Sequence, residues 1–258
     1  MLPSNLEPKA IIEDSPSIFV EEDPPIALEA PKPRSPCDVL VAGALAVDFS
    51  CDYAPIPGST SLLSPQLHTS NPARITPTIG GVAHNIAKAA HLLGTSVRLC
   101  SMVGDDLSGR AAVAQLSADG MDTSFIKTLD GTTGERTAQY VAVNDLSKNL
   151  VMAMADMSIL ETPQDDFETS WGMEVAASKP KWLVADTNWE PKTLSAWLKA
   201  GKAAGALTAV EPVSVAKSTR IVSGALSKTT KSVNQRPHPV FPNPVSYTHL
   251  TLPTILRV

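Results

Sequence analysis

The sequence has few cysteines, no long apolar run and no excess of basic charge, and each shortage excludes a class of protein. The three cysteines, Cys37, Cys51 and Cys100, are too few and too far apart for a disulfide framework or a zinc site, which favours a reducing, cytoplasmic setting. The longest apolar run, Val39–Val47, is shorter than the roughly 18 residues that a membrane span needs. A net charge of −5 and a pI near 5.5 argue against a nucleic-acid-binding protein.

Proline is abundant near the two ends of the chain and sparse between them. Of the 22 prolines, eight lie in residues 1–36 and five in residues 237–253. Residues 1–36 also carry seven acidic side chains against three basic ones, which is unlike a secretory signal. A proline-rich, charged segment without periodicity cannot bury enough surface to fold by itself. We therefore expect residues 1–36 to be a disordered acidic tail or an interdomain linker.

Between these ends, strand-like and helix-like segments alternate. Val39–Val47 is a continuous apolar run typical of a buried strand, and Val82–Leu93 has apolar residues at helical spacing before Gly94. The other expected elements are a strand at Val97–Val103, a helix at Leu107–Asp119, a helix within Asp165–Ser178, a strand at Trp182–Ala185, a helix within Thr193–Ala204 and a strand at Leu207–Val210. Such alternation predicts an α/β fold with a central parallel sheet flanked by helices.

The rhythm differs in residues 137–156. Thr137–Val143 alternates with period two, a polar turn follows, and Leu150–Ala155 is a second apolar segment. This pattern predicts an antiparallel hairpin. On a parallel sheet such a hairpin is commonly a lid, and an ordinary edge hairpin is the alternative.

Polar side chains follow several of the expected strands. They are Asp48, the run Gly104-Asp105-Asp106, the run Asp186-Thr187-Asn188, and Glu211. Ligands of parallel sheets bind beyond the carboxyl ends of the strands, and acid and amide groups suit a ligand with many hydroxyls. Strand ends also lie near solvent, so a role in solvation alone is the alternative for any one of these residues.

The segment Thr78–Ala87 joins a double glycine, Gly80-Gly81, to a helix whose first turn carries Asn85. Glycines let the backbone approach a ligand closely, and the helix start leaves N–H groups free to bind it. Together with Gly94 and Gly104, this spacing resembles the first signature of the ribokinase-like (PfkB) carbohydrate kinase family. The resemblance covers residues 38–243.

Within that family the sequence is most similar to pseudouridine kinases, especially the fungal form that follows a pseudouridine-5′-phosphate glycosidase domain. The similarity rests on Gln139–Asp145, Ala153–Met157 and Glu211–Lys217. Val82 stands where the ribokinases of the family usually have a lysine, which disfavours ribose itself as the substrate. The resemblance thus implies a ribokinase-like sheet with a small antiparallel lid, a possible homodimer through that lid, and a possible fusion to a glycosidase domain.

The resemblance also implies an activity and a site. The activity is ATP-dependent phosphorylation, with magnesium, of the 5′-hydroxyl of pseudouridine or of a related nucleoside or sugar. The sugar would be bound by the side chain of one residue of the first strand, by the double glycine and by residues of the first helix and the lid, namely Asp48, Gly80, Gly81, Asn85 and Asp156. Asn188 and Glu211 would lie near the path of the phosphate or its magnesium ion.

One part of the family's pattern is missing. The catalytic base and the anion hole belong to a later motif, Asp-Thr-x-Gly-Ala-Gly-Asp, which does not occur in this sequence. We therefore expect residues 37–244 to be the N-terminal part of a kinase domain, incomplete at the C-terminus and inactive alone. Residues 245–258 lack acidic side chains and helical periodicity, and we expect them to be a non-native tail.

Three other functions remain open to different degrees. The chain is a kinase for another sugar, or it acts without catalysis as a ligand-binding or dimerising module. A dinucleotide-dependent oxidoreductase is disfavoured, because Val41–Ala46 lacks the second and third glycines of the Gly-x-Gly-x-x-Gly pattern.

Overall fold

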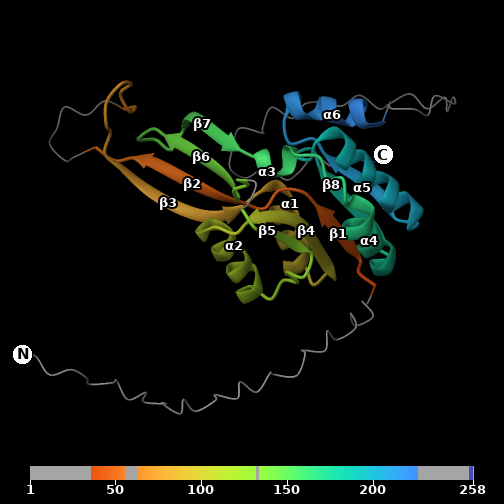
Figure 1. The fold of residues 1–258 in the computed structure, drawn as a ribbon. Helices are drawn as coiled ribbons and strands as arrows, with labels where there is room; N and C mark the ends of the chain where they lie inside the picture. Colours follow the sequence, from red (N-terminus) through yellow and green to blue (C-terminus); the bar gives the residue numbers. More distant parts are fainter. Residues whose placement is uncertain (1–35, 56–62, 132–133, 226–255, 258) are drawn as a thin grey trace, which may run out of the picture. The chain divides into compact units, whose positions relative to one another are not determined.

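The described residues of the chain form two β-sheets, and helices flank the larger one (Figure 1). The computed structural model describes residues 36–55, 63–131, 134–225 and 256–257. Residues 1–35 of the expected tail, and all but two of residues 245–258, lie outside the described residues, so neither expectation is tested. No helix among the described residues has the length and apolar character that a bilayer crossing requires.

The main sheet has the strand order β10-β9-β8-β1-β4-β5, and β9, β8, β1, β4 and β5 run parallel to one another. The strands are β1 (Val39–Ala42), β4 (Val97–Gly104), β5 (Ile126–Leu129), β8 (Trp182–Asp186), β9 (Leu207–Glu211) and β10 (Leu256–Arg257). β10 is antiparallel and pairs with Ala209 and Val210 of β9. The expected parallel sheet is therefore confirmed, and β10 occupies part of the outer edge of β9.

Helices cover both faces of this sheet because alternate residues of each strand point to opposite faces. On one face, Val41 and Leu99 pack with α1 (Val82–Leu92) and α2 (Leu107–Ala118). On the other face, Leu40 and Leu183 pack with three buried tryptophans. The elements on that side are α3 (Ser158–Glu161), the π-helix η1 (Glu168–Gly172), α4 (Met173–Ser178) and α5 (Pro191–Ala203). The last described helix is α6 (Val215–Ala225), which packs on α5.

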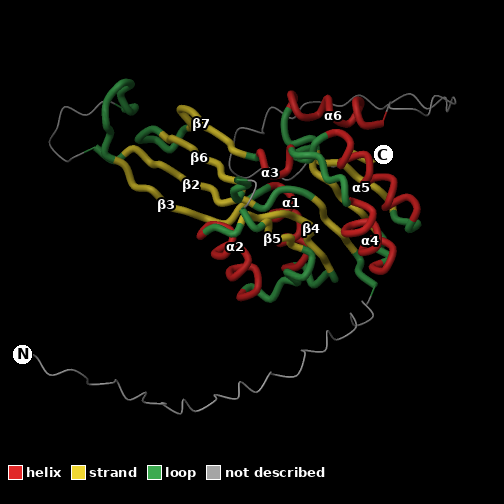
Figure 2. Tube along the Cα trace, in the orientation of Figure 1, coloured by secondary structure: helices red, strands yellow, loops and turns green. Residues whose placement is uncertain are grey.

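The small sheet has the order β3-β2-β6-β7 (Figure 2). Its strands are β2 (Ala46–Tyr53), β3 (Ala73–Gly80), β6 (Ala138–Asn144) and β7 (Leu150–Asp156). β6 and β7 form the antiparallel hairpin expected at residues 137–156. The sequence pattern did not indicate that β2 pairs with β6 and that β3 adds a fourth strand.

The expected single strand Val39–Val47 is wrong, because the chain leaves the main sheet after Ala42 and enters the small sheet at Ala46. All residues from Leu40 to Val47 are buried, including those of the crossing between β1 and β2 (residues 43–45). The apolar run therefore gives no sign in the sequence that the chain changes sheets there. Asp48 is therefore the third residue of β2 and lies within a strand, not after one.

Candidate functional site

Asp48 and Gly80 meet where β2 and β3 enter the main body of the fold. A Cβ atom added to Gly80 would lie 1.9 Å from Oδ2 of Asp48, so only glycine leaves room for this carboxylate. Tyr140 of β6 pairs with Asp48 and shares its face of the small sheet. Burial, and then the charge of Asp48, raises the pKa of the Tyr140 hydroxyl. Two of the expected site residues are thus in contact.

Gly81 begins α1 in a conformation that other residues rarely adopt, with φ at +98°. A Cβ atom here would lie 2.3 Å from the carbonyl oxygen of Ala44, in the crossing between β1 and β2. The double glycine therefore lets the start of α1 pack against that crossing. The same carbonyl oxygen of Ala44 accepts a hydrogen bond from the backbone N–H of His84 (3.1 Å).

Asp186, at the end of β8, ties these segments together. Its Oδ2 accepts hydrogen bonds from the backbone N–H groups of Ala44 (2.8 Å) and Ala83 (3.1 Å), and its Oδ1 accepts one from Asn188 (2.9 Å). The side chain is fully buried, and desolvation raises its pKa although these donors oppose the shift. Asp186 thus acts as a clamp between the crossing, the start of α1 and the end of β8.

A second buried acid, Glu211, lies beside Asp186 on the neighbouring strand β9. Its Oε1 accepts a hydrogen bond from Val213 N–H (3.3 Å), and its Oε2 is buried without a partner among the described residues. Burial, reinforced by the charge of Asp186, raises the pKa of Glu211 to about 7. The two carboxyl groups therefore form a pair that readily holds a proton near neutral pH.

Asn188 follows Asp186 and faces α6. Its Oδ1 accepts a hydrogen bond from Nζ of Lys217 (2.9 Å), and Lys217 also forms an ion pair with Glu161 (3.3 Å). Arg220 donates to the carbonyl oxygens of residues 187–189 and to Glu161. Two cations thus secure the loop after β8 at the carboxyl edge of the main sheet.

These residues do not fit a magnesium ion by themselves. The side-chain oxygen of Asn188 is occupied by an ammonium group, and Glu211 is buried with a raised pKa. No three acid, histidine or cysteine side chains of the described residues cluster as metal ligands. We derive no chemical step through a metal held by these residues.

Asp156 lies apart from Asp48. In the register of the small sheet it pairs with Gln139, which is paired with Val47, and this places it on the opposite face from Asp48. Its carboxylate accepts from the Ser158 hydroxyl (2.7 Å) and forms an ion pair with Arg136 (2.9 Å). The hydrogen bonds from Ser158 lower its pKa. Of the expected sugar-binding residues, the structure groups Asp48, Gly80, Gly81 and Asn85, and separates Asp156.

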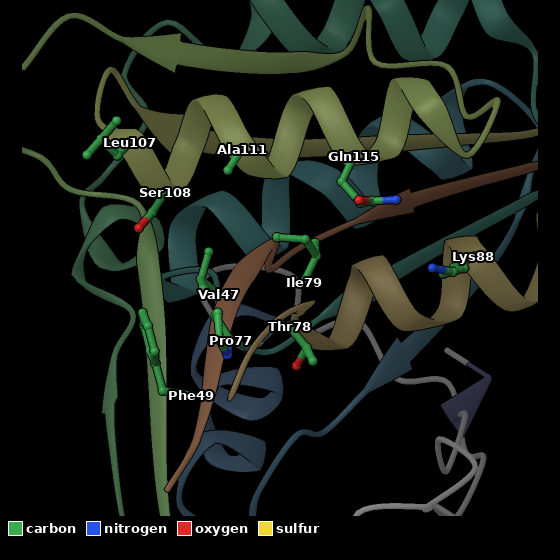
Figure 3. Close-up of a pocket in the computed structure, with 10 residues that line it drawn as sticks. All are labelled: Val47, Phe49, Pro77, Thr78, Ile79, Lys88, Leu107, Ser108, Ala111 and Gln115. Carbon is green, nitrogen blue, oxygen red and sulfur yellow. The ribbon is translucent and has the colours of Figure 1, made fainter. Parts of the chain in front are cut away.

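A hollow of about 550 Å³ opens on that opposite face (Figure 3). Val47 and Phe49 of β2 and Pro77 of β3 form one wall, and Leu107 and Ala111 of α2 form the other. Val47 and Phe49 flank Asp48 in β2, so their side chains point away from its face. The Asp48 side chain does not line the hollow, although Thr78, which pairs with Asp48, does.

Two residues of the site were not singled out by sequence reasoning. Asp186 was only one of several strand-exit residues, and nothing in the sequence indicates that three backbone N–H groups converge on it. His84 is buried next to Asn85, within the same double-glycine segment, and its position there was the available signal.

Residues 38–243 match the sequence pattern of the pfkB family of carbohydrate kinases. The chain is 31% identical over 127 residues to the pseudouridine-metabolizing bifunctional protein of Schizosaccharomyces pombe, which covers 49% of this chain and 16% of that protein. It is 31% identical over 152 residues to the pseudouridine kinase of Escherichia coli, covering 59% of this chain and 46% of the kinase. The chain spans less than half the length of these curated relatives.

Solved structures show the same fold. A carbohydrate kinase from Agrobacterium tumefaciens is 25% identical, with a TM-score of 0.62 over 74% of this chain and 58% of that one. The ribokinase of Giardia lamblia is 16% identical, with a TM-score of 0.51 over 65% of this chain and 50% of that one, and it supports the fold alone.

Proposed function

Because this chain belongs to the pfkB family of carbohydrate kinases, we propose that it forms the sugar-binding part of a kinase for pseudouridine or a related nucleoside. Two curated relatives that act on pseudouridine, each 31% identical, support this substrate class. The observation that carries the proposal is the contact between the Asp48 carboxylate and Gly80. A carboxylate beside bare backbone is a suitable acceptor for hydrogen bonds from the hydroxyls of a sugar.

We assign roles to the residues as follows. Asp48 accepts hydrogen bonds from sugar hydroxyls, Gly80 and Gly81 let the sugar approach the backbone, and the small sheet serves as the lid. Asp156, the last residue of β7, lies on the opposite face of the small sheet from Asp48. For Asp156 to reach the ligand, the end of β7 has to rotate toward the Asp48 face. Asn188 and Glu211 mark the phosphate end, because Asn188 follows β8 and Glu211 is the last residue of β9, both at the carboxyl edge of the main sheet.

The proposed reaction is transfer of a phosphoryl group from ATP, assisted by magnesium, to the 5′-hydroxyl of the nucleoside. The sequence contains no Asp-Thr-x-Gly-Ala-Gly-Asp motif to supply a base, so we expect this chain to bind the nucleoside without turnover. Re-reading the gene beyond codon 244 for an in-frame Gly-Ala-Gly-Asp, and for a fused glycosidase domain as in the bifunctional relative, checks this part of the proposal.

Calorimetric titration of the chain with pseudouridine tests the binding proposal. We expect Asp48→Asn to weaken binding about tenfold or more, since hydrogen bonds to a charged group contribute about 1.5–3 kcal/mol. Asp38→Asn is the matched control, because Asp38 lies at the opposite end of β1 and pairs with Lys181 (2.7 Å). Its effect is expected to stay within about twofold.

Parallel titrations with uridine and ribose distinguish the alternatives. Preference for ribose or another sugar favours a kinase for that sugar, and tight binding that Asp48→Asn leaves unchanged moves the ligand to a different site. Equal losses for Asp48→Asn and Asp38→Asn contradict the proposed role of Asp48.

A further inference from the structure

His84 and Asn85 are consecutive residues in the first turn of α1, and their side chains are joined although their environments differ. The His84 ring is 1% exposed, whereas Asn85 is exposed to solvent. Nδ1 of His84 lies 3.1 Å from Oδ1 of Asn85. The backbone of Asn85 donates to the carbonyl oxygen of Gly81 (2.9 Å), so the pair is anchored to the double glycine.

The contact specifies which ring nitrogen carries the proton. An amide oxygen only accepts hydrogen bonds, so Nδ1 of His84 must be the donor. The other nitrogen, Nε2, is buried without a partner among the described residues. In the tautomer that this contact requires, Nε2 carries no proton. The protein therefore does not bury an N–H group without an acceptor.

The surrounding charges are consistent with a neutral ring. Burial lowers the pKa of His84, and the charge of Lys88 acts in the same direction. The opposing charge of Asp119 is paired with Lys88 itself (2.9 Å). The ring therefore donates through Nδ1 without carrying a positive charge.

We propose that His84 is a positioning residue that holds the side-chain oxygen of Asn85, so that the Asn85 amide nitrogen is offered to an oxygen atom of the ligand. Oδ1 and Nδ2 leave the same carbon in different directions, and Nδ2 has no hydrogen-bond partner within the described residues. The site then presents an acceptor, Asp48 beside Gly80, and a donor, Asn85 in the helical turn that begins at Gly81. A sugar can use both at once, because its hydroxyl donates to the carboxylate while another of its oxygen atoms accepts from the amide.

This inference deepens the proposed function and rests on it for the identity of the ligand, but its first test needs no ligand. Long-range ¹H–¹⁵N correlation spectra report the tautomer of each of the five histidines. The His84 signals are assigned by their loss in His84→Asn. We expect the Nδ1–H tautomer for His84. An Nε2–H tautomer or a cationic ring at pH 7.5 overturns the inference, whether or not pseudouridine binds.

The second test compares two substitutions of His84 whose amide groups replace different ring nitrogens. His84→Asn places an amide N–H near the position of Nδ1, whereas His84→Gln places it near Nε2. We expect pseudouridine affinity within about twofold of wild type for the asparagine variant, and a loss of about twofold to tenfold beyond that for the glutamine variant. Thermal melting confirms that both variants fold. Equal affinity of the two variants contradicts the inference, and absence of binding by the wild type contradicts the proposed function and leaves the tautomer to decide the role of His84.

Discussion

At the scale of single residues, Glu211 has an unusual charge state. It is 8% exposed, lies beside the buried Asp186, and has a pKa of about 7 against an ordinary value of 4.5. Only one of its oxygens has a hydrogen-bond donor among the described residues. The folded protein therefore holds a proton on Glu211 more tightly than the unfolded chain does.

This difference predicts how stability depends on pH. Between about pH 5 and pH 7 the folded state binds more protons at Glu211 than the unfolded state, so the free energy of unfolding falls as pH rises. The Glu211 contribution has a slope of up to about 1.4 kcal/mol per pH unit. Below the unfolded pKa both states are protonated, and above the folded pKa the full penalty of the buried charge is present.

Urea denaturation of wild type and Glu211→Gln from pH 5 to pH 8 measures this effect. We expect a distinctly flatter profile for the glutamine variant and higher stability than wild type at pH 8. Glu168→Gln, at an exposed position, is the control and keeps the wild-type profile. Parallel profiles for wild type and Glu211→Gln would show that Glu211 does not titrate in this range.

Sequence reasoning singled out part of the candidate site at this scale. Gly80, Gly81 and Asn85 could be found because a double glycine before a helix is a local pattern. Asp48 was found as a polar residue at the end of an apolar run, although it lies inside β2. Asp186 could not be assigned a role, because its partners come from segments that only the fold brings together. His84 could not be assigned one, because its role depends on burial, which the sequence does not report.

At the scale of secondary structure elements, Asp106 connects α2 to the small sheet. It is the N-cap of α2, and its Oδ1 accepts from Gly109 N–H (2.7 Å). Its carboxylate also accepts from the backbone N–H and the hydroxyl of Thr137, both at 2.8 Å. Thr137 immediately precedes β6, so one side chain orders the starts of two elements.

Asp106→Ala is therefore expected to cost more than the loss of an ordinary cap. Capping contributes about 1 kcal/mol and each of the two bonds to Thr137 adds about 0.5–1 kcal/mol, giving about 2–3 kcal/mol in urea denaturation. Hydrogen exchange should also become faster across Ala138–Asn144. The neighbouring Asp105→Ala removes an exposed ion pair with Arg110 and is expected to cost less than about 1 kcal/mol. Similar costs for the two variants would argue against this connecting role.

Several elements escaped prediction for identifiable reasons. β3 contains Pro77 and mostly exposed residues, which is unlike a core strand. It is an edge strand of the small sheet, where a residue without an N–H is tolerated. β5 has only four residues, so it gives no strong periodic signal. β4, β8 and β9 of the main sheet and the helices α1, α2 and α5, by contrast, were predicted close to their observed bounds, because each is an apolar run or has apolar residues at helical spacing.

At the scale of the whole molecule, the small sheet has an apolar face. Met154 pairs with Val141, which pairs with Phe49, and Phe49 pairs with Pro77, so one row of apolar side chains crosses all four strands. The side chains of Met154 and Ile75 are both 61% exposed. We propose that a second copy of the chain covers the part of this face that carries Met154 and Ile75, because contiguous apolar surface of this kind commonly marks an interface.

Light scattering after size-exclusion chromatography checks this proposal. We expect the wild type at twice the chain mass of 27.2 kDa, and Met154→Asp as a monomer. Ala153→Asp is the control, because Ala153 points to the opposite face of the same strand and leaves the dimer intact. A monomeric wild type at tens of micromolar, or a dimer that Met154→Asp does not disrupt, would contradict the proposed interface.

The hydrogen bonds of Asp186 have a consequence for where the chain tolerates insertions. The chain leaves the main sheet beside Ala44 and returns beside Ala83, and both backbone N–H groups bind the same carboxylate. Everything between these two points, including β2, β3 and their connection, forms an excursion whose two ends are held together at one place. Insertions in the connection between Tyr53 and Ala73 therefore leave the exit and return points of the excursion unchanged. That connection is accordingly the natural place to graft a reporter peptide or a fluorophore without disturbing the main sheet.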